Sequence, residues 1–135
     1  MVPNLSNYSS RALALLRIVA GLLFLEHATQ KFLGFPVPFP LPGPLPPLLI
    51  AAGAIEFIAG ALITLGLFTR LAAFIASGEM AIAYFMQHFP KSPWPAANGG
   101  EAAILYCFIF LYLACAGGGA WSIDRARTKS IRGRI

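Results

Sequence analysis

Four apolar stretches of helix length dominate this sequence, and each of them contains one glutamate: Glu26, Glu56, Glu79 and Glu101. About 20 apolar residues are enough for a helix to cross the hydrocarbon core of a bilayer. An ionisable side chain at that depth costs roughly 2.5–3.5 kcal/mol on insertion scales, so it normally faces a bundle interior or a partner. The recurrence of this placement predicts a membrane bundle with a polar interior, and we expect the function to lie there.

The composition supports this interpretation. Of the 135 residues, 58% are hydrophobic and only 11% are charged, whereas soluble domains average about 25% charged residues. A soluble domain of this size could not hide so much apolar surface. The sequence therefore predicts an all-α integral membrane four-helix bundle, a single domain over residues 1–135, with the lipid bilayer rather than nucleic acid as its surroundings.

Two proline-rich segments, at residues 35–47 and 90–100, divide the apolar sequence. Proline lacks the N–H donor and clashes with the preceding turn, so neither segment can continue a helix. The resulting spans are expected at about 11–33, 46–68, 70–89 and 100–121, followed by a basic tail at 124–135. The two halves of the sequence share one order of elements: a helix with a Phe-rich end, a proline-rich loop and a second helix. This shared order indicates an internal duplication.

Basic residues are distributed unequally between the two ends of these spans. The side of the proline-rich loops carries only Lys31 and Lys91, whereas the other side carries Arg11, Arg17, Arg70, Arg125, Arg127, Lys129, Arg132 and Arg134. Because cytoplasmic segments are enriched in Lys and Arg, we expect a multi-pass protein of the cell (inner) membrane with both termini in the cytoplasm. We interpret Arg17, which lies inside the first span, as snorkelling to the cytoplasmic surface; pairing with an acidic side chain is the alternative.

The polar residues fall into two layers when depth is counted at about 1.5 Å per residue. Glu56 and Glu79 lie near the midplane, and small residues surround each of them, so we expect both to face other helices. The remaining polar groups lie toward the outer side. Together these residues form the predicted proton or ligand pocket, which comprises Glu26, His27, Lys31, Glu56, Glu79, His88 and Glu101.

Several chemistries fit these residue types. A proton relay or a cavity for a polar substrate needs only protonatable groups in a low-dielectric interior, and interhelical hydrogen bonding without further function is the alternative. A metal site of His27, His88 and Glu101, with Glu26, has acceptable ligands, but adjacent side chains on a helix diverge by about 100°, so it is a weak candidate. A haem held between the two histidines is weaker still.

An ordered set of short motifs resembles the DoxX family of small membrane proteins. The resemblance extends over about residues 11–124, and the segments that carry it are 16–19, 25–27, 31–34, 56–60, 65–70 and 98–101. In the family pattern the first-span histidine is usually followed by glycine, whereas here Ala28 follows His27. The resemblance implies a four-helix membrane protein.

The same resemblance suggests a function. Some family members are linked to thiosulfate:quinone oxidoreduction and others to redox or quinone stress, which implies a redox-associated subunit with a quinone as cofactor and a redox partner protein or a homo-oligomer. The sequence has no flavin, haem or iron–sulfur motif, and catalytic residues are not identified. A non-catalytic scaffold or chaperone for a partner protein, and a small solute- or lipid-binding transporter, are the alternatives.

Overall fold

The computed structural model describes residues 5–133 and contains only helices and loops in that range. The main helices are α1 (Ser9–Leu33), α2 (Pro47–Leu65), α3 (Thr69–Ala83), α4 (Pro95–Asn98), α5 (Glu101–Ala116) and α6 (Ile123–Arg132). A short 3₁₀ turn (Leu5–Tyr8) precedes α1, and a π-helical turn (Tyr84–His88) and a second 3₁₀ turn (Phe89–Lys91) extend α3. The expected all-α class is confirmed. Arg134, counted above among the basic residues, lies outside the described residues.

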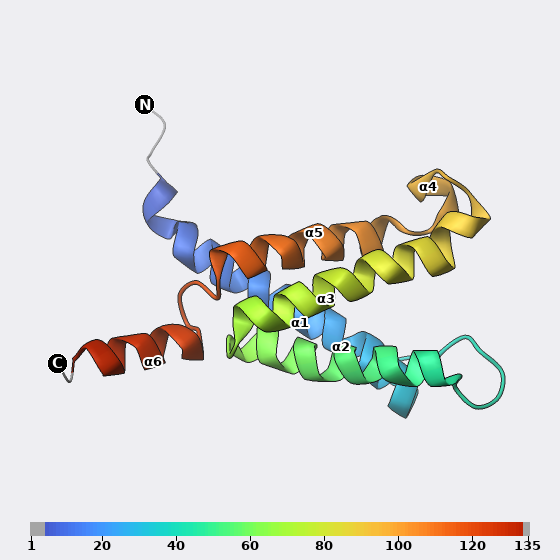
Figure 1. Cartoon of the computed structure of the whole chain (residues 1–135), viewed down its shortest axis with the longest axis horizontal. Coiled ribbons are helices and arrows are strands. Elements are labelled where there is room, and N and C mark those ends of the chain that lie inside the picture. Colours follow the sequence, from blue (N-terminus) through green and yellow to red (C-terminus); the bar gives the residue numbers. More distant parts are fainter. Residues whose placement is uncertain (1–4, 134–135) are drawn as a thin grey trace.

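The helices are arranged as two pairs. Helix α1 packs mainly on α2, α3 packs mainly on α5, and the contact between α2 and α3 joins the pairs. The start of α1, the α2–α3 turn and α6 lie at one end of the molecule, and the two proline-rich segments lie at the other (Figure 1). We call these the terminal end (Ser10, residues 66–70 and 114–133) and the loop end (residues 34–46 and 84–100).

The helix boundaries differ from the expected spans where glycine intervenes. Helix α2 ends at Leu65 rather than near residue 68, because Gly66 takes a left-handed conformation with φ 71° and its N–H caps the helix. Helix α5 ends at Ala116 rather than near residue 121, because three consecutive glycines follow Ala116. The expected basic tail contains a helix, α6, because the Ser122 side chain caps its first turn by accepting a hydrogen bond from the Arg125 N–H.

Two of the helical segments in the described residues are long and apolar enough to cross a membrane. They are Leu5–Leu33 and Pro47–Leu65, and α5 is a shorter apolar helix. Side chains around them point outward in large numbers: Leu22, Leu23, Ile58 and Phe74 are each about half exposed or more. Contiguous apolar surface of this kind is rare on soluble monomers, so the outside of the bundle suits lipid.

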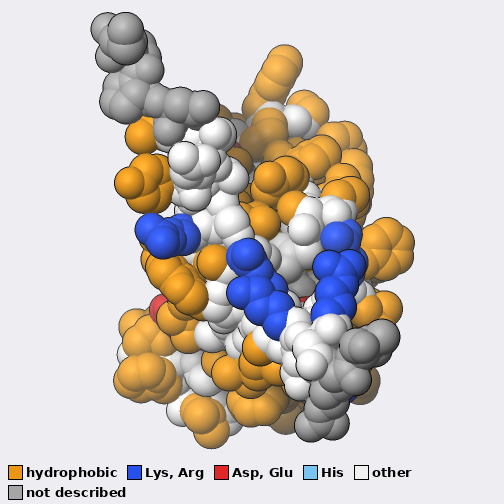
Figure 2. All heavy atoms as spheres, turned by 90° about the vertical axis from the view of Figure 1, so that its left-hand side faces the viewer, with side chains coloured by type: hydrophobic (Ala, Val, Ile, Leu, Met, Phe, Trp, Pro, Cys, Tyr) orange, Lys and Arg blue, Asp and Glu red, His pale blue; other side chains and the backbone are white. Residues whose placement is uncertain are grey.

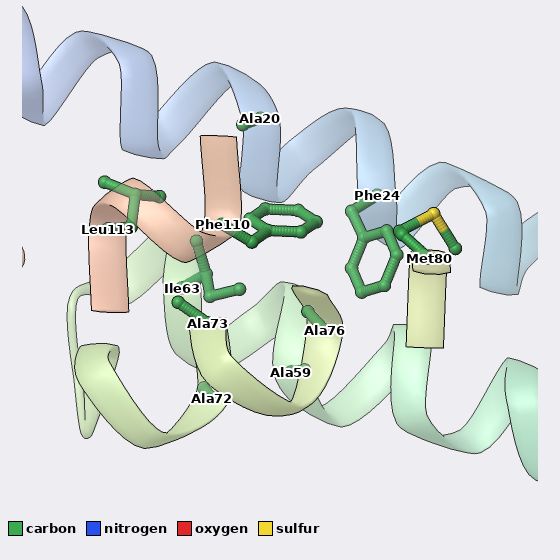
Figure 3. Close-up of a cluster of buried hydrophobic side chains, with 10 residues drawn as sticks. All are labelled: Ala20, Phe24, Ala59, Ile63, Ala72, Ala73, Ala76, Met80, Phe110 and Leu113. Atoms are coloured by element: carbon green, nitrogen blue, oxygen red, sulfur yellow. The ribbon is translucent and has the colours of Figure 1, made fainter. Parts of the chain in front are cut away.

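Alanine makes up half of the buried core. The core contains two phenylalanines in edge-to-face contact, Phe24 and Phe110, with ring centroids 4.8 Å apart, and Figure 3 shows them among short side chains from all four long helices. Its ten members are Ala20, Phe24, Ala59, Ile63, Ala72, Ala73, Ala76, Met80, Phe110 and Leu113. Small residues let helix backbones approach closely where lipid supplies no hydrophobic driving force.

Glycine sets the crossing of α1 and α2. A Cβ added to Gly21 would lie 2.5 Å from the Thr64 hydroxyl and 2.8 Å from the Thr64 backbone nitrogen. A Cβ added to Gly60 would lie 3.0 Å from the backbone of Leu25. Both positions therefore require glycine, and the resulting close approach brings polar groups of the two helices within reach of each other.

Candidate functional site

Lys31 and Glu56 form an ion pair inside the bundle. The Lys31 ammonium donates to both carboxylate oxygens of Glu56 at 2.7 Å, and the two side chains are only 7% and 5% exposed. Lys31 belongs to the last turns of α1 and Glu56 to the middle of α2. The two layers expected from the sequence are therefore joined at Lys31, because its long side chain reaches along the helix to the level of Glu56.

Local sequence makes room for this ion pair. Glu56 lies on the buried stripe of α2 that also contains Gly53, Ala59 and Gly60, as expected from the small residues around it. A Cβ at Gly53 would lie 3.3 Å from the Lys31 side chain, so glycine lets the lysine stem pass. Phe39, from the first proline-rich segment, covers the ammonium with its ring centroid 5.2 Å from the nitrogen.

Glu79 is the third member of this cluster, which we call the interior centre (Lys31, Glu56 and Glu79). Both of its carboxyl oxygens are buried and have no hydrogen-bond partner in the described residues. The carboxyl interacts electrostatically with Glu56 and Lys31. A buried polar group without a partner is costly, so such a group in a native interior suggests a proton, ligand or water at that position.

Glu26 and His27 lie on the outside of α1. Both residues are exposed, and the His27 ring packs edge-on against Tyr106 of α5 with centroids 6.1 Å apart. Glu26 lines a cavity of about 490 Å³ together with Leu22, Leu25, Thr29, Phe35 and Pro36. That cavity lies between α1 and the segment after it, and none of the other predicted pocket residues lines it.

His88 and Glu101 lie at the loop end. The Nδ1 of His88 donates to the Asn98 carbonyl at 3.0 Å, and its ring stacks on Tyr84 at 6.3 Å. Asn98 in turn donates to the Ser92 carbonyl and accepts from the Gly100 N–H. His88 thus holds the second proline-rich segment in place. Glu101 is exposed in the first turn of α5, where a negative charge suits the helix N-terminus.

The weak metal candidate gains no support from this arrangement. Within residues 5–133, no group of three or more His, Cys, Asp or Glu side chains could hold a metal ion. No hydrogen bond, ion pair or ring contact joins His27 to His88 in the same range.

The interpretation of Arg17 as a snorkelling side chain is wrong. Arg17 is completely buried and donates to four backbone carbonyls, those of Ile63, Thr64, Gly118 and Trp121. Two of these carbonyls end α2: that of Ile63 also accepts from the Gly66 N–H, whereas no second donor reaches that of Thr64 in the described residues. The guanidinium has five donors in a planar fork, which suits it to join the end of α2 to the glycine-rich segment after α5.

Arg70 makes equivalent hydrogen bonds in the second helix pair, α3 and α5. Sequence analysis predicted neither these bonds nor those of Arg17. Arg70 donates to the carbonyls of Ala114 and Cys115, which lie three and two residues before Gly117. The Arg17 acceptors in α2 lie three and two residues before Gly66. A signal was available, because nine positions separate Arg17 from Glu26 and likewise Arg70 from Glu79.

Asp124, the acidic residue outside the four apolar stretches, connects α6 to α3. Its carboxylate accepts hydrogen bonds from the Phe68 N–H and from both the N–H and the hydroxyl of Thr69. Partial burial raises the pKa of this carboxyl, but the hydrogen bonds from Thr69 and Phe68 outweigh it, and the pKa lies below its usual range. Asp124 therefore caps the first turn of α3 in place of a local residue.

An apolar exterior, small-residue helix packing and a buried ion pair define a helical membrane protein. The sequence pattern of the DoxX family matches residues 12–89, more than half of the chain. The chain therefore belongs to the DoxX family. It is 46% identical over 126 residues to a protein of Haemophilus influenzae described as uncharacterized, with 90% of this chain and 94% of that protein covered. No solved structure matches the chain significantly.

Proposed function

We propose that this DoxX-family protein spans the membrane four times and uses the interior centre to take up and release a proton. The spans are α1, α2, α3 with its π turn, and α5, and the loop end faces outward. The observation that carries the proposal is that neither buried Glu79 oxygen has a hydrogen-bond partner within residues 5–133, although the buried Lys31–Glu56 ion pair lies beside it.

The charges of the centre explain why one proton is exchangeable. With Lys31 charged and Glu56 ionised, a protonated Glu79 leaves the centre neutral, which is the state that a low-dielectric interior tolerates best. Release of that proton leaves one uncompensated negative charge beside Glu56. A ligand that donates a hydrogen bond or brings a positive charge to Glu79 therefore favours release, and its departure favours uptake.

Within this role we assign the protein to the redox-associated members of the family, with a quinone-type ring as the ligand. Quinone reduction consumes protons together with electrons, and this chain's own contribution is a proton held at the Glu79 carboxyl. The electrons come from a redox partner protein. His27, His88, Glu26 and Glu101 are the groups at the outward side through which the centre exchanges protons with water.

Infrared spectroscopy of the purified protein tests the proposed proton on Glu79. We expect a C=O stretch typical of a protonated carboxyl at neutral pH, because no hydrogen-bond donor in the described part of the chain stabilises the ionised form of Glu79. Glu79→Gln should remove this band. Glu101→Gln, the same chemical change at an exposed carboxyl, should leave it intact. A band that survives Glu79→Gln would contradict the proposal.

Labelling of single cysteines tests the four-span topology with both termini in the cytoplasm. In a background with Cys107 and Cys115 replaced by alanine, Ser92→Cys should react with an impermeant thiol reagent applied to intact cells. Ser130→Cys should react only after the membrane is opened. The opposite pattern would reverse the orientation. Equal labelling of both positions from outside would contradict the single span, α5, that the proposal places between them.

The alternatives differ in what remains bound after gentle extraction. A quinone or a redox protein in the purified sample supports the proposed role. A stable complex with another protein that carries no redox cofactor favours the scaffold, and a bound lipid or solute at the interior centre favours the transporter. Mass spectrometry of the extracted sample distinguishes the three, with Glu79→Gln as the variant that should lose a ligand held at this centre.

A further inference from the structure

A second cavity lies far from the interior centre, at the terminal end of the bundle. Its volume is about 570 Å³, and it lies between the start of α3, the glycine-rich segment after α5, and α6. Figure 2 looks onto this end and shows separate groups of basic side chains in the middle of the face, with hydrophobic side chains around them. None of the residues predicted for the proton pocket lines it.

The lining of this cavity carries a net positive charge. Arg70 and Arg125 contribute two guanidinium groups against the single carboxylate of Asp124. That carboxylate is already engaged by the three donors of Phe68 and Thr69, so it is directed toward the start of α3. The charge left for a ligand is that of the two arginines.

Both arginines retain side-chain donors that are not bonded to any acceptor in residues 5–133. Arg70 donates only through Nη1, to the carbonyls that end α5. Its Nε and Nη2 lie next to Gly117, within 3.6 Å of the position that a Cβ on Gly117 would occupy. The Arg125 side chain donates only through Nη1, to the Ser10 hydroxyl. The backbone N–H groups of Gly118 and Gly119 donate to no acceptor in the described residues. Planar guanidinium forks together with free backbone donors suit a phosphate group.

The position of the cavity indicates the source of that phosphate. It lies where the apolar helices end, next to the exposed aromatic side chain of Phe68, while Trp121 is exposed at the same end. Aromatic side chains gather at the headgroup level of a membrane, and basic pockets between helices on the cytoplasmic side bind anionic headgroups. A phosphate at this depth belongs to a lipid of the adjacent leaflet.

We propose that this cavity binds the phosphate group of an anionic phospholipid, held by Arg70 and Arg125 across the glycine-rich segment. The proposal requires that the bundle lie in a membrane but does not depend on the proton chemistry of the interior centre. The bound headgroup would join α3, α6 and the end of α5, and would thereby stabilise the terminal end.

Lipid binding to the purified, delipidated full chain tests this proposal. Phosphatidylglycerol should bind in preference to phosphatidylcholine, measured by native mass spectrometry, and should raise the thermal unfolding temperature. Arg125→Gln should weaken the binding of phosphatidylglycerol roughly fivefold, the factor that one basic side chain contributes near an anionic surface. Arg125 is exposed, and its side chain makes one hydrogen bond in the part of the chain that the structure describes, to the Ser10 hydroxyl, so the variant should remain folded.

Two further variants and a free ion complete the experiment. Arg70→Gln should also weaken binding, and circular dichroism checks that α5 remains helical. Arg132→Gln removes the same charge from an α6 position outside the cavity and should change binding less than about twofold. Equal losses in all three variants, or no preference for phosphatidylglycerol, would overturn the proposal. A response to inorganic phosphate without one to phosphatidylglycerol would overturn the lipid as the occupant.

Discussion

Arg17→Ala is expected to leave the protein unable to hold its fold. The substitution removes a donor from four carbonyls, those of Ile63, Thr64, Gly118 and Trp121, and only Ile63 keeps a second donor in the described residues, the Gly66 N–H. Each buried carbonyl left without a donor costs about 1–3 kcal/mol, and small domains have only about 5–15 kcal/mol in total. Denaturant titration of the detergent-extracted protein, followed by tryptophan fluorescence, measures the loss.

Two further substitutions provide comparisons for Arg17→Ala. Arg17→Lys keeps the charge but offers a single ammonium in place of a planar fork. The stability of this variant should therefore lie between that of Arg17→Ala and that of the native protein. Arg11→Ala is the matched control, because Arg11 is exposed two turns earlier in α1 and contacts only the Tyr8 ring at 5.8 Å; its cost should be below about 1 kcal/mol. If Arg17→Ala and Arg11→Ala behave alike, the four hydrogen bonds contribute no stability.

The second large effect is expected at the Lys31–Glu56 ion pair. Glu56→Ala leaves a buried ammonium without its partner, and Lys31→Met leaves two carboxyls without a cation. Each change should cost about 3–5 kcal/mol. The double variant Lys31→Met, Glu56→Met should recover a large part of this loss, because well-packed apolar side chains often replace a buried ion pair without net cost.

A double-mutant cycle measures the coupling between the two side chains. A coupling free energy near zero would contradict the ion pair, and Glu101→Ala, at an exposed carboxyl, should change stability by less than about 0.5 kcal/mol. Glu56→Gln should destabilise as well, because the amide has the size of the carboxyl but lacks the charge that balances Lys31.

The sequence predicted the helical stretches and the buried faces, because both follow from hydrophobic run length and helical periodicity. Glu56 lies on the small-residue stripe of α2 as expected. Side-chain reach was harder to predict: Lys31 was placed in the outer layer by its backbone position, whereas its ammonium lies beside Glu56. Periodicity locates a Cα on a helix face, but a long flexible side chain carries its charge to another level.

Arg17 was misinterpreted for a related reason. Its depth, about one and a half turns into the first span, suggested that its charge would reach the cytoplasmic surface, with pairing to an acidic side chain as the alternative. The acceptors are backbone carbonyls at the end of α2 and after α5, and every helix end supplies such groups whatever its sequence. The helix α6 was missed because its basic composition resembles a tail, while the cap at Ser122 and the anchoring of Asp124 are contacts made only in the folded chain.

The π turn at Tyr84–His88 lies where the spacing of the two helix pairs differs. Phe35 follows Arg17 by 18 positions, whereas Phe89 follows Arg70 by 19. A π-helical turn accommodates one more residue than an α-helical turn, and one residue rotates the side chains beyond it by about 100° around the helix axis. The arginine–carbonyl contacts at the terminal end therefore share a spacing that the loop end does not. At the loop end, His88 directly precedes Phe89 where Gly34 directly precedes Phe35, so the two pairs present different chemistry there.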